Sequence, residues 1–442
     1  MDRDPNPRPI GHAPASSGYA WSVFALTFAL MIFDFVDRQV VVSMFPHLKA
    51  YWGLSDGQLG GLVSIVSFVV ALGTVPLSLL ADRWSRVKCM FAMALVWSLA
   101  TIGCAFAQSY GQLLFMRGVI GLGEAGYGAA GAALLASLFP GRLRSTVLGA
   151  FLAAGLFGSV LGVVLGGVIA ERWGWQAGFG AVGVPGLVLA FAFLMVVRDY
   201  KTVALPGASG AKGATATGRS LRVIFAEVLR PRTVLIACLG AGLQLVMVSA
   251  TYAWLPSYFN RYYGFAPDKA GLAAGAVVLA SGFGAIAWSM LADRLAQRRP
   301  RARLLVPLVA AVTTACLMFS AFGAMSPGPA QLALIVAGGL TMTASIGPVA
   351  AVIVDVVHPG VRATAASILS LTQNLFGLAA GPMLGGLLSD AYGLPFALAA
   401  APAFCLAAAV MFAFASGTYE RDLGRARGDV GSEGTGASPQ AA

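Results

Sequence analysis

Long apolar runs alternate with short polar stretches along almost the whole of this 442-residue chain. A helix needs about 20 predominantly apolar residues to cross the hydrocarbon core of a bilayer. The pattern therefore predicts an all-α polytopic membrane protein with twelve transmembrane helices, at roughly 19–46, 57–81, 88–108, 111–139, 143–170, 177–197, 232–258, 268–292, 303–323, 328–356, 361–389 and 393–416.

The two halves of this pattern share short motifs in the same order. The matching segments are 78–83 with 289–294, 140–141 with 359–360, and 156–158 with 375–377. Their near-constant spacing indicates a duplication that produced two six-helix bundles, 19–197 and 232–416. Two such bundles that move about a site near the bilayer midplane are typical of secondary transporters.

Three polar segments complete the organisation. We expect residues 1–18 to form a cytoplasmic tail, 198–231 a cytoplasmic linker, and 417–442 a disordered cytoplasmic tail. Within the linker, 206–218 is rich in Gly, Ala and Thr and reads as flexible. The stretch 219–230 alternates basic and apolar residues and is either an amphipathic helix on the leaflet or a solvated linker.

Composition and charge support the membrane assignment. The chain is 58% hydrophobic and only 11% charged, whereas soluble domains contain about 25% charged residues. Its net charge of +11 comes mainly from Lys and Arg in alternate loops, which predicts cytoplasmic termini and, we expect, the bacterial inner membrane. No basic motif with interleaved aromatics argues for nucleic acid. We expect a monomer whose partners are the bilayer and a small-molecule or lipid substrate.

Metal and enzyme chemistry find little support in the sequence. The five cysteines lie in or beside apolar segments without metal-ligand spacing, and the three histidines are scattered. The common phosphate-binding, metalloprotease and nucleophile-elbow motifs do not occur at a membrane–water boundary. We therefore predict no enzyme activity, no metal site and no cofactor, with a proton gradient as the energy source.

Five charged residues interrupt the apolar spans of the first half. They are Asp34, Asp37 and Arg38 in the first span, and Arg117 and Glu124 in the fourth. Ionisable side chains at membrane depth are costly and usually mark an ion or substrate pathway. Asp34 and Arg38 are four residues apart and so lie on one helix face. Asp37 lies about 100° from Arg38 and is expected to face a central cavity.

These charges suggest a coupling mechanism. Burial favours the neutral form of a carboxylate, whereas a nearby arginine favours the charged form. A carboxylate whose arginine partner changes with conformation would bind and release a proton in step with transport. We predict that Asp37 and Glu124 are the proton-coupling pair, with Asp34, Arg38 and Arg117 as charge partners. The alternative is a static network that only stabilises the bundle.

The 78–88 segment carries a family resemblance. It reads Ser-Leu-Leu-Ala-Asp-Arg-Trp-Ser-Arg-Val-Lys and resembles the G-x-L-A-D-R-x-G-R-[KR] motif of the major facilitator superfamily, with serines replacing both glycines. The resemblance implies alternating access and a cytoplasmic latch near the ends of helices 5 and 11. The residues implied in this gate are Asp82, Arg83, Arg86, Arg144, Asp293, Arg294 and Arg362.

Further motifs resemble the spinster branch of that superfamily. They are the Asp37-Arg38 pair, the run 123–127 that ends at Tyr127, and Leu138-Phe139-Pro140 ahead of Arg144. The R-x-x-x-G-x-G-E pattern from Arg117 to Glu124 resembles the superfamily as a whole. Spinster proteins are linked to export of lysolipids and sphingoid lipids. The organic-anion symporter branch, which takes up sugar acids, shares the charge pattern.

The second half offers no buried charge for a substrate, so we expect neutral polar and aromatic contacts. The substrate-binding candidates are Phe33, Tyr127, Gln244, Tyr252, Trp254, Thr372, Gln373 and Asn374. We predict a proton-coupled transporter of an amphipathic, lysolipid- or sphingoid-like, or hydrophobic organic substrate. The alternative is a symporter of protons with an organic anion such as a sugar acid. A channel or a non-transporting receptor is the competing class.

Overall fold

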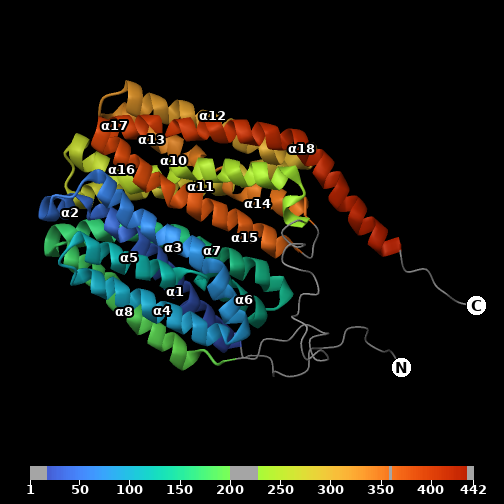
Figure 1. Ribbon diagram of the computed structural model, residues 1–442, viewed down its shortest axis with the longest axis horizontal. Coiled ribbons are helices and arrows are strands. Elements are labelled where there is room, and N and C mark those ends of the chain that lie inside the picture. The colour runs from blue at the N-terminus through green and yellow to red at the C-terminus, as the bar shows by residue number, and fades with distance from the viewer. Residues whose placement is uncertain (1–16, 200–226, 358–360, 436–442) are drawn as a thin grey trace, which may run out of the picture.

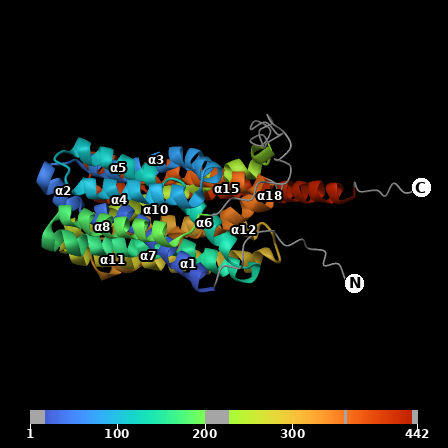
Figure 2. The same cartoon turned by 90° about the horizontal axis from the view of Figure 1, so that it is seen from below.

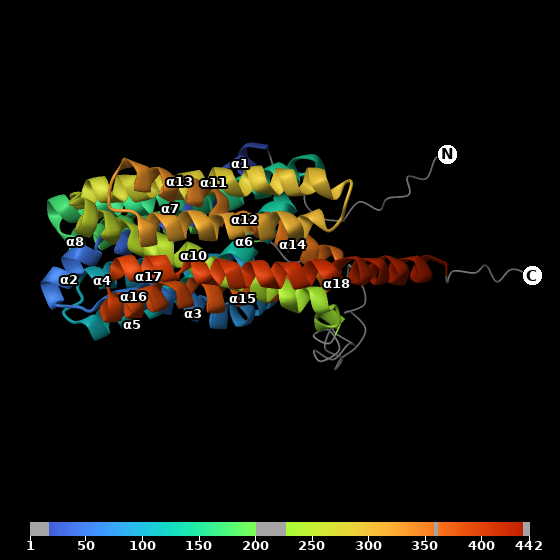
Figure 3. The same cartoon turned by 90° about the horizontal axis from the view of Figure 1, so that it is seen from above.

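The computed structural model describes residues 17–199, 227–357 and 361–435, which are mostly helical. Figure 1 shows two helical halves that lie side by side along the long axis, the first coloured blue to green and the second yellow to red. Figure 2 is seen from the side of the first half and Figure 3 from the side of the second. Within the described ranges, the predicted all-α class is confirmed.

The first half contains eight helices. They are α1 (Ser17–Ser43), α2 (Phe45–Trp52), α3 (Asp56–Arg83), α4 (Arg86–Ala105), α5 (Tyr110–Glu124), α6 (Tyr127–Leu138), α7 (Gly141–Trp173) and α8 (Trp175–Val196). The bend between α5 and α6 is at Gly126, whose φ of +96° is accessible to glycine at little cost.

In its described residues, the second half contains two π-helical segments among its α-helices. Its elements are α10 (Arg232–Tyr263), α11 (Pro267–Ala296), α12 (Ala302–Phe319), η1 (Ser320–Ala324), α13 (Pro329–Met342), α14 (Ile346–Asp355), α15 (Arg362–Thr372), η3 (Gln373–Leu378), α16 (Ala380–Tyr392), α17 (Leu394–Ala400) and α18 (Pro402–Thr435).

Eleven helical segments in the described part of the chain are long and apolar enough to cross a membrane. The remaining predicted span, 361–389, is built from α15, η3 and α16 rather than from one continuous helix. The π-helical turn η3 interrupts it, and such turns inside helices often occur at functional sites.

One segment that was predicted to be disordered is largely helical in the structure. The segment 417–442 was expected to be disordered, yet α18 continues to Thr435, and Figure 1 shows it extending beyond the bundle. Most of the 198–231 linker, including residues 200–226, lies outside the described residues, as do residues 1–16.

Glycines on α7 bring it close to α1, the helix that carries three of the buried charges. A Cβ atom at Gly162 would lie 2.6 Å from the carbonyl oxygen of Val36, and one at Gly158 would lie 2.5 Å from that of Ile32. Real Cβ atoms do not approach carbonyl oxygens this closely. The small residues therefore allow the backbones of α1 and α7 to touch, which holds these two helices together within the first half.

Candidate functional site

Arg38 of α1 lies between two buried carboxylates. Its Nε donates to Oδ1 of Asp34 at 3.0 Å, the predicted contact one helical turn away. Its Nη2 lies 2.9 Å from Oε2 of Glu124 on α5. Side chains on a helix lean toward its N-terminus, so Arg38 extends toward the deeper level where both carboxylates lie.

Arg117 of α5 has different partners. Its Nη1 lies 3.5 Å from Oδ1 of Asp37 and donates to the backbone oxygen of the same residue at 3.1 Å. Its Nε donates to the backbone oxygen of Leu62 at 3.1 Å. Thr101 of α4 donates to Oδ2 of Asp37 at 2.6 Å. Arg117 thus joins α5 to α1 and α3, and Thr101 joins α4 to α1.

The observed pairs are crossed relative to the sequence interpretation, which associated Asp37 with Arg38 and Arg117 with Glu124. Asp37 was also expected to face the central cavity, but it is fully buried against Arg117 and Thr101. The reason is rotational, because Asp37 and Arg38 leave α1 about 100° apart and only one of them points toward the bundle axis.

This cluster contains three carboxylates but only two guanidinium groups. Asp34, Asp37, Arg117 and Glu124 are each at most 3% exposed. Neither oxygen of Glu124 has a hydrogen-bond partner, although Oε2 is ion-paired with Arg38. With every group ionised the cluster has one uncompensated negative charge, which is expensive in a low-dielectric interior. One added proton or one bound cation would remove it.

A cavity with about 550 Å³ of atom-free space, open part included, adjoins this cluster. Both halves contribute to its wall. The lining residues are Phe35, Arg38, Gln39, Val42, Val63, Val66, Ser67 and Arg117 from the first half, and Ser249, Tyr252, Ala253, Leu378 and Pro382 from the second. Two arginines therefore face a wall that is mostly apolar.

Among the predicted substrate residues, Tyr252 lines this cavity, and its hydroxyl contacts that of Ser281. Tyr127 is fully buried elsewhere, with its ring edge-on to Trp97. Trp254 is also fully buried and donates to the backbone oxygen of Pro382 at 2.9 Å. Two of the three aromatic candidates in this paragraph, Tyr127 and Trp254, are therefore packing residues that do not line the cavity.

The other candidates lie outside the lining of the cavity. Gln244 is buried and donates to the backbone oxygen of Met342 at 2.9 Å. Thr372 and Asn374 donate to backbone oxygens one helical turn earlier. Gln373 begins the π-helical turn η3, and Phe33 packs against the hydrophobic core.

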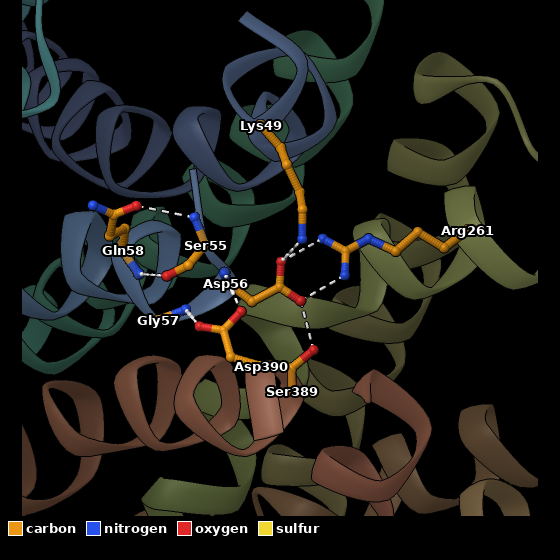
Figure 4. A network of polar contacts seen from close by, with 8 residues as sticks. All are labelled: Lys49, Ser55, Asp56, Gly57, Gln58, Arg261, Ser389 and Asp390. Carbon is orange, nitrogen blue, oxygen red and sulfur yellow. Dashed lines mark hydrogen bonds and ion pairs between the residues drawn. The ribbon is translucent and has the colours of Figure 1, made fainter. Parts of the chain in front are cut away.

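A second polar cluster joins the two halves at the end of the molecule that carries α2, here called the α2 end (Figure 1). Figure 4 shows Asp56, the first residue of α3, surrounded by Lys49, Arg261 and Ser389. Lys49 donates at 2.6 Å, Arg261 donates two bonds at 2.6 and 2.8 Å, and Ser389 donates at 2.5 Å.

Asp390 of α16 completes this cluster from the second half. Its two carboxylate oxygens accept the backbone N–H groups of Asp56 and Gly57, both at 2.7 Å. These are free N–H groups of the first turn of α3, where a negative charge is also favoured by the helix dipole. We call Lys49, Asp56, Arg261, Ser389 and Asp390 the α2-end clasp.

Sequence reasoning missed the clasp, and also Gln39, Thr101 and Ser249. Lys49 and Arg261 lie in the last turns of α2 and α10, where basic residues are common because they complement the helix dipole. The available signal for Asp56 was its place after Ser55 at the start of an apolar run, which marks a helix N-terminus.

The sequence model of the Major Facilitator Superfamily matches residues 27–380 of this chain and, in a second match, residues 253–434. This chain belongs to the Major Facilitator Superfamily. The predicted family is therefore confirmed, and the chain is a secondary transporter rather than an enzyme.

Individual superfamily relatives differ in what their names say they carry. The chain is 28% identical over 93% of its length to an MFS-type efflux pump of Mycolicibacterium smegmatis, covering 95% of that protein. It is 26% identical over 89% to the gallate transporter of Pseudomonas putida, covering 92% of it. It is 27% identical over 81% to the mouse sphingosine-1-phosphate transporter SPNS2, covering 68% of it.

Solved structures show the superfamily fold. A bacterial homolog of the human lysosomal transporter spinster, in an inward-facing and unoccupied conformation, matches with a TM-score of 0.81. The sequences are 21% identical, and the match covers 92% of this chain and 99% of that one. The predicted resemblance to the spinster branch is confirmed by this structural match and by the match to SPNS2.

The gate residues that the superfamily motif implies lie at the opposite end from the clasp. Asp293 of α11 is paired at 3.2 Å with Arg303 of α12, in its own half, and Arg303 also contacts Asp355. Arg294, Arg144 and Arg362 are exposed and Arg86 is half-buried, while the side chains of Asp82 and Arg83 lie outside the described part. The latch between the halves stays a prediction.

Proposed function

We propose that this transporter couples protons to the movement of an amphipathic organic anion, by alternating access. The observation that carries the proposal is the buried cluster of three carboxylates and two arginines beside a cavity shared by both halves. The cluster supports proton binding because one proton balances its charge. The cavity supports an anion with an apolar body because Arg38 and Arg117 face apolar walls.

Glu124 is the group best suited to exchange the proton. Arg38, its ion-pair partner, is 18% exposed and lines the cavity. An anion bound to Arg38 weakens the attraction that keeps Glu124 charged, so anion and proton bind more tightly together than singly. This linkage favours symport for an anionic substrate. Asp37 stays a second proposed coupling residue, held by Thr101 and Arg117.

The substrate class rests on the chemistry of the cavity and on the relatives. A lysolipid with an anionic head and an aromatic acid share an anionic group joined to an apolar body. The relatives of this chain include both a sphingosine-1-phosphate transporter and a gallate transporter. A sugar acid, the alternative from the sequence, is less well served because the arginines face apolar side chains, among them Phe35, Val63 and Leu378.

We further propose the orientation that the positive-inside rule favours, with both termini cytoplasmic in a bacterial inner membrane and the protein monomeric. The α2 end then lies outside, and the clasp closes the outer side.

Proteoliposome transport under an imposed pH gradient tests the proposal. Two labelled probes, a lysophospholipid and gallate, are compared with and without a protonophore. We expect accumulation of at least one probe, its loss with the protonophore, and accelerated counterflow exchange. Accumulation that is indifferent to the protonophore would refute proton coupling, and absent counterflow would indicate a channel.

A further inference from the structure

Two polar groups in the cavity wall have no hydrogen-bond partner among the described residues. They are Nη2 of Arg117 and the amide oxygen of Gln39. Arg117 is fully buried, and both residues line the cavity. A buried polar atom without a partner is costly, and a ligand that pairs with it recovers that free energy.

The two groups are chemically complementary to one kind of ligand. The guanidinium Nη2 only donates, and it carries positive charge, so it suits a carboxylate oxygen. The Gln39 oxygen accepts, so it suits a hydroxyl of the same ligand. Phe35, Val63 and Leu378 from three elements of the wall suit an aromatic or alicyclic ring between these groups.

From this complementarity we propose that Gln39 and Arg117 form a specificity subsite for hydroxylated aromatic or alicyclic acids. The inference rests on the proposed function and deepens it. Nη2 of Arg117 binds the carboxylate together with Arg38, and Gln39 selects acids that carry a ring hydroxyl. A site built to pair with a hydroxyl discriminates strongly against the analogue that lacks it, because its own polar group is then left unpaired.

The test compares initial uptake of gallate with that of benzoate in proteoliposomes. Wild type should prefer gallate by at least about tenfold, the lower range for one unpaired buried group. Gln39→Leu, of similar size, should bring the preference close to one, because neither acid then meets an unpaired amide oxygen at this position. Ser67→Ala, another polar position of the wall, should keep the preference.

Three results decide against the subsite. An unchanged preference in Gln39→Leu, or equal uptake of both acids by wild type, overturns it. Uptake of lysophospholipid but of neither acid also overturns it and leaves the proposed function intact. If no probe accumulates under the pH gradient, the proposed function itself fails.

A separate observation concerns the α2-end clasp. Asp56 is 2% exposed and receives donors from both halves, and Asp390 reaches across the seam to cap α3. The charges of the clasp balance, because the cations Lys49 and Arg261 face the carboxylates of Asp56 and Asp390. The backbones also touch here, since a Cβ at Gly60 would overlap the Pro382 oxygen and one at Gly386 the Asp56 oxygen.

The geometry points to the clasp as a gate that must break whenever the α2 end opens. Each polar contact of the clasp that joins the two halves would then be broken, and its groups would bind water instead. Loss of one partner leaves a buried charge uncompensated in the closed state only, so it shifts the population toward opening. The repeat-related position of Asp390 is Glu171 on α7, whose carboxylate is 3.9 Å from His47 within its own half.

Spin labels at the exposed positions Tyr51 and Tyr392 measure this opening by electron–electron distance distributions, with Cys316 replaced by serine. Arg261→Ala and Asp390→Asn should each increase the long-distance population at least about tenfold relative to the short one. The matched control Glu171→Gln should leave the distribution unchanged. Monodisperse Arg261→Ala and Asp390→Asn proteins with wild-type distributions would overturn the gate.

Discussion

Arg38 holds Glu124 through a single ion pair, with Nη2 of the arginine 2.9 Å from Oε2 of the carboxylate. The same guanidinium is bonded to Asp34 through Nε, so Glu124 shares its cation with another acid. Asp37, by contrast, has Arg117 and Thr101 as partners. Glu124 is therefore the carboxylate whose charge is least compensated.

Glu124→Gln should abolish proton-driven accumulation while preserving substrate exchange. Glutamine keeps the shape of the side chain but cannot exchange a proton, so substrate still binds and crosses without the gradient. Accumulation under a pH gradient and counterflow are measured in the same proteoliposomes. Glu171→Gln, at a half-exposed position, serves as control. If Glu124→Gln still accumulated substrate under the pH gradient, Glu124 would not be the proton-coupling residue.

Arg117→Lys should destabilise the fold although it conserves charge. The arginine uses Nε for the Leu62 oxygen and Nη1 for Asp37, and a lysine ammonium cannot reproduce this planar geometry. Loss of one such buried bond costs about 1–3 kcal/mol. Thermal unfolding in detergent should show a lower midpoint. The control is Arg172→Lys, at an exposed position. Equal midpoints for both variants would contradict a structural role for the Nε and Nη1 hydrogen bonds of Arg117.

Gly162→Ala should lower stability, whereas Gly149→Ala on the same helix should not. The added methyl group at 162 would lie 2.6 Å from the Val36 oxygen, which forces α7 away from α1. At 149 nothing lies within 4 Å, and alanine favours a helix by up to about 1 kcal/mol over glycine. Proteolysis resistance in mild detergent provides the comparison. Equal resistance of the two variants would show that the helices adjust freely.

Helix positions follow directly from the sequence, because an apolar run of sufficient length leaves the chain few alternatives in a bilayer. The charges of α1 and α5 were found for the same reason, since any ionisable residue is conspicuous there. Their pairing was not predictable, because it depends on how α1 and α5 rotate against each other. A one-residue difference on a helix changes direction by about 100°.

The clasp shows a different limit. Asp56 and Arg261 are 205 residues apart in the chain, and Asp56 and Asp390 are 334 apart. Each resembles an ordinary charge at the end of a span, and only the packing of the two halves makes them neighbours. The interruption of the 361–389 span at η3 was equally hidden, since Gln373–Leu378 reads as a continuous helix.

Gly60→Ala should favour opening of the α2 end without removing any charge. Its new methyl group would overlap the Pro382 oxygen in the closed seam, a clash that disappears once the halves separate. A cysteine at the cavity position Ser249 should then react faster with an impermeant maleimide added from the α2 side. Gly111→Ala, at the same end with nothing within 4 Å, should react like the parent. If Gly60→Ala also reacted like the parent, close backbone contact would not control closure, and the clasp charges alone would have to hold the seam.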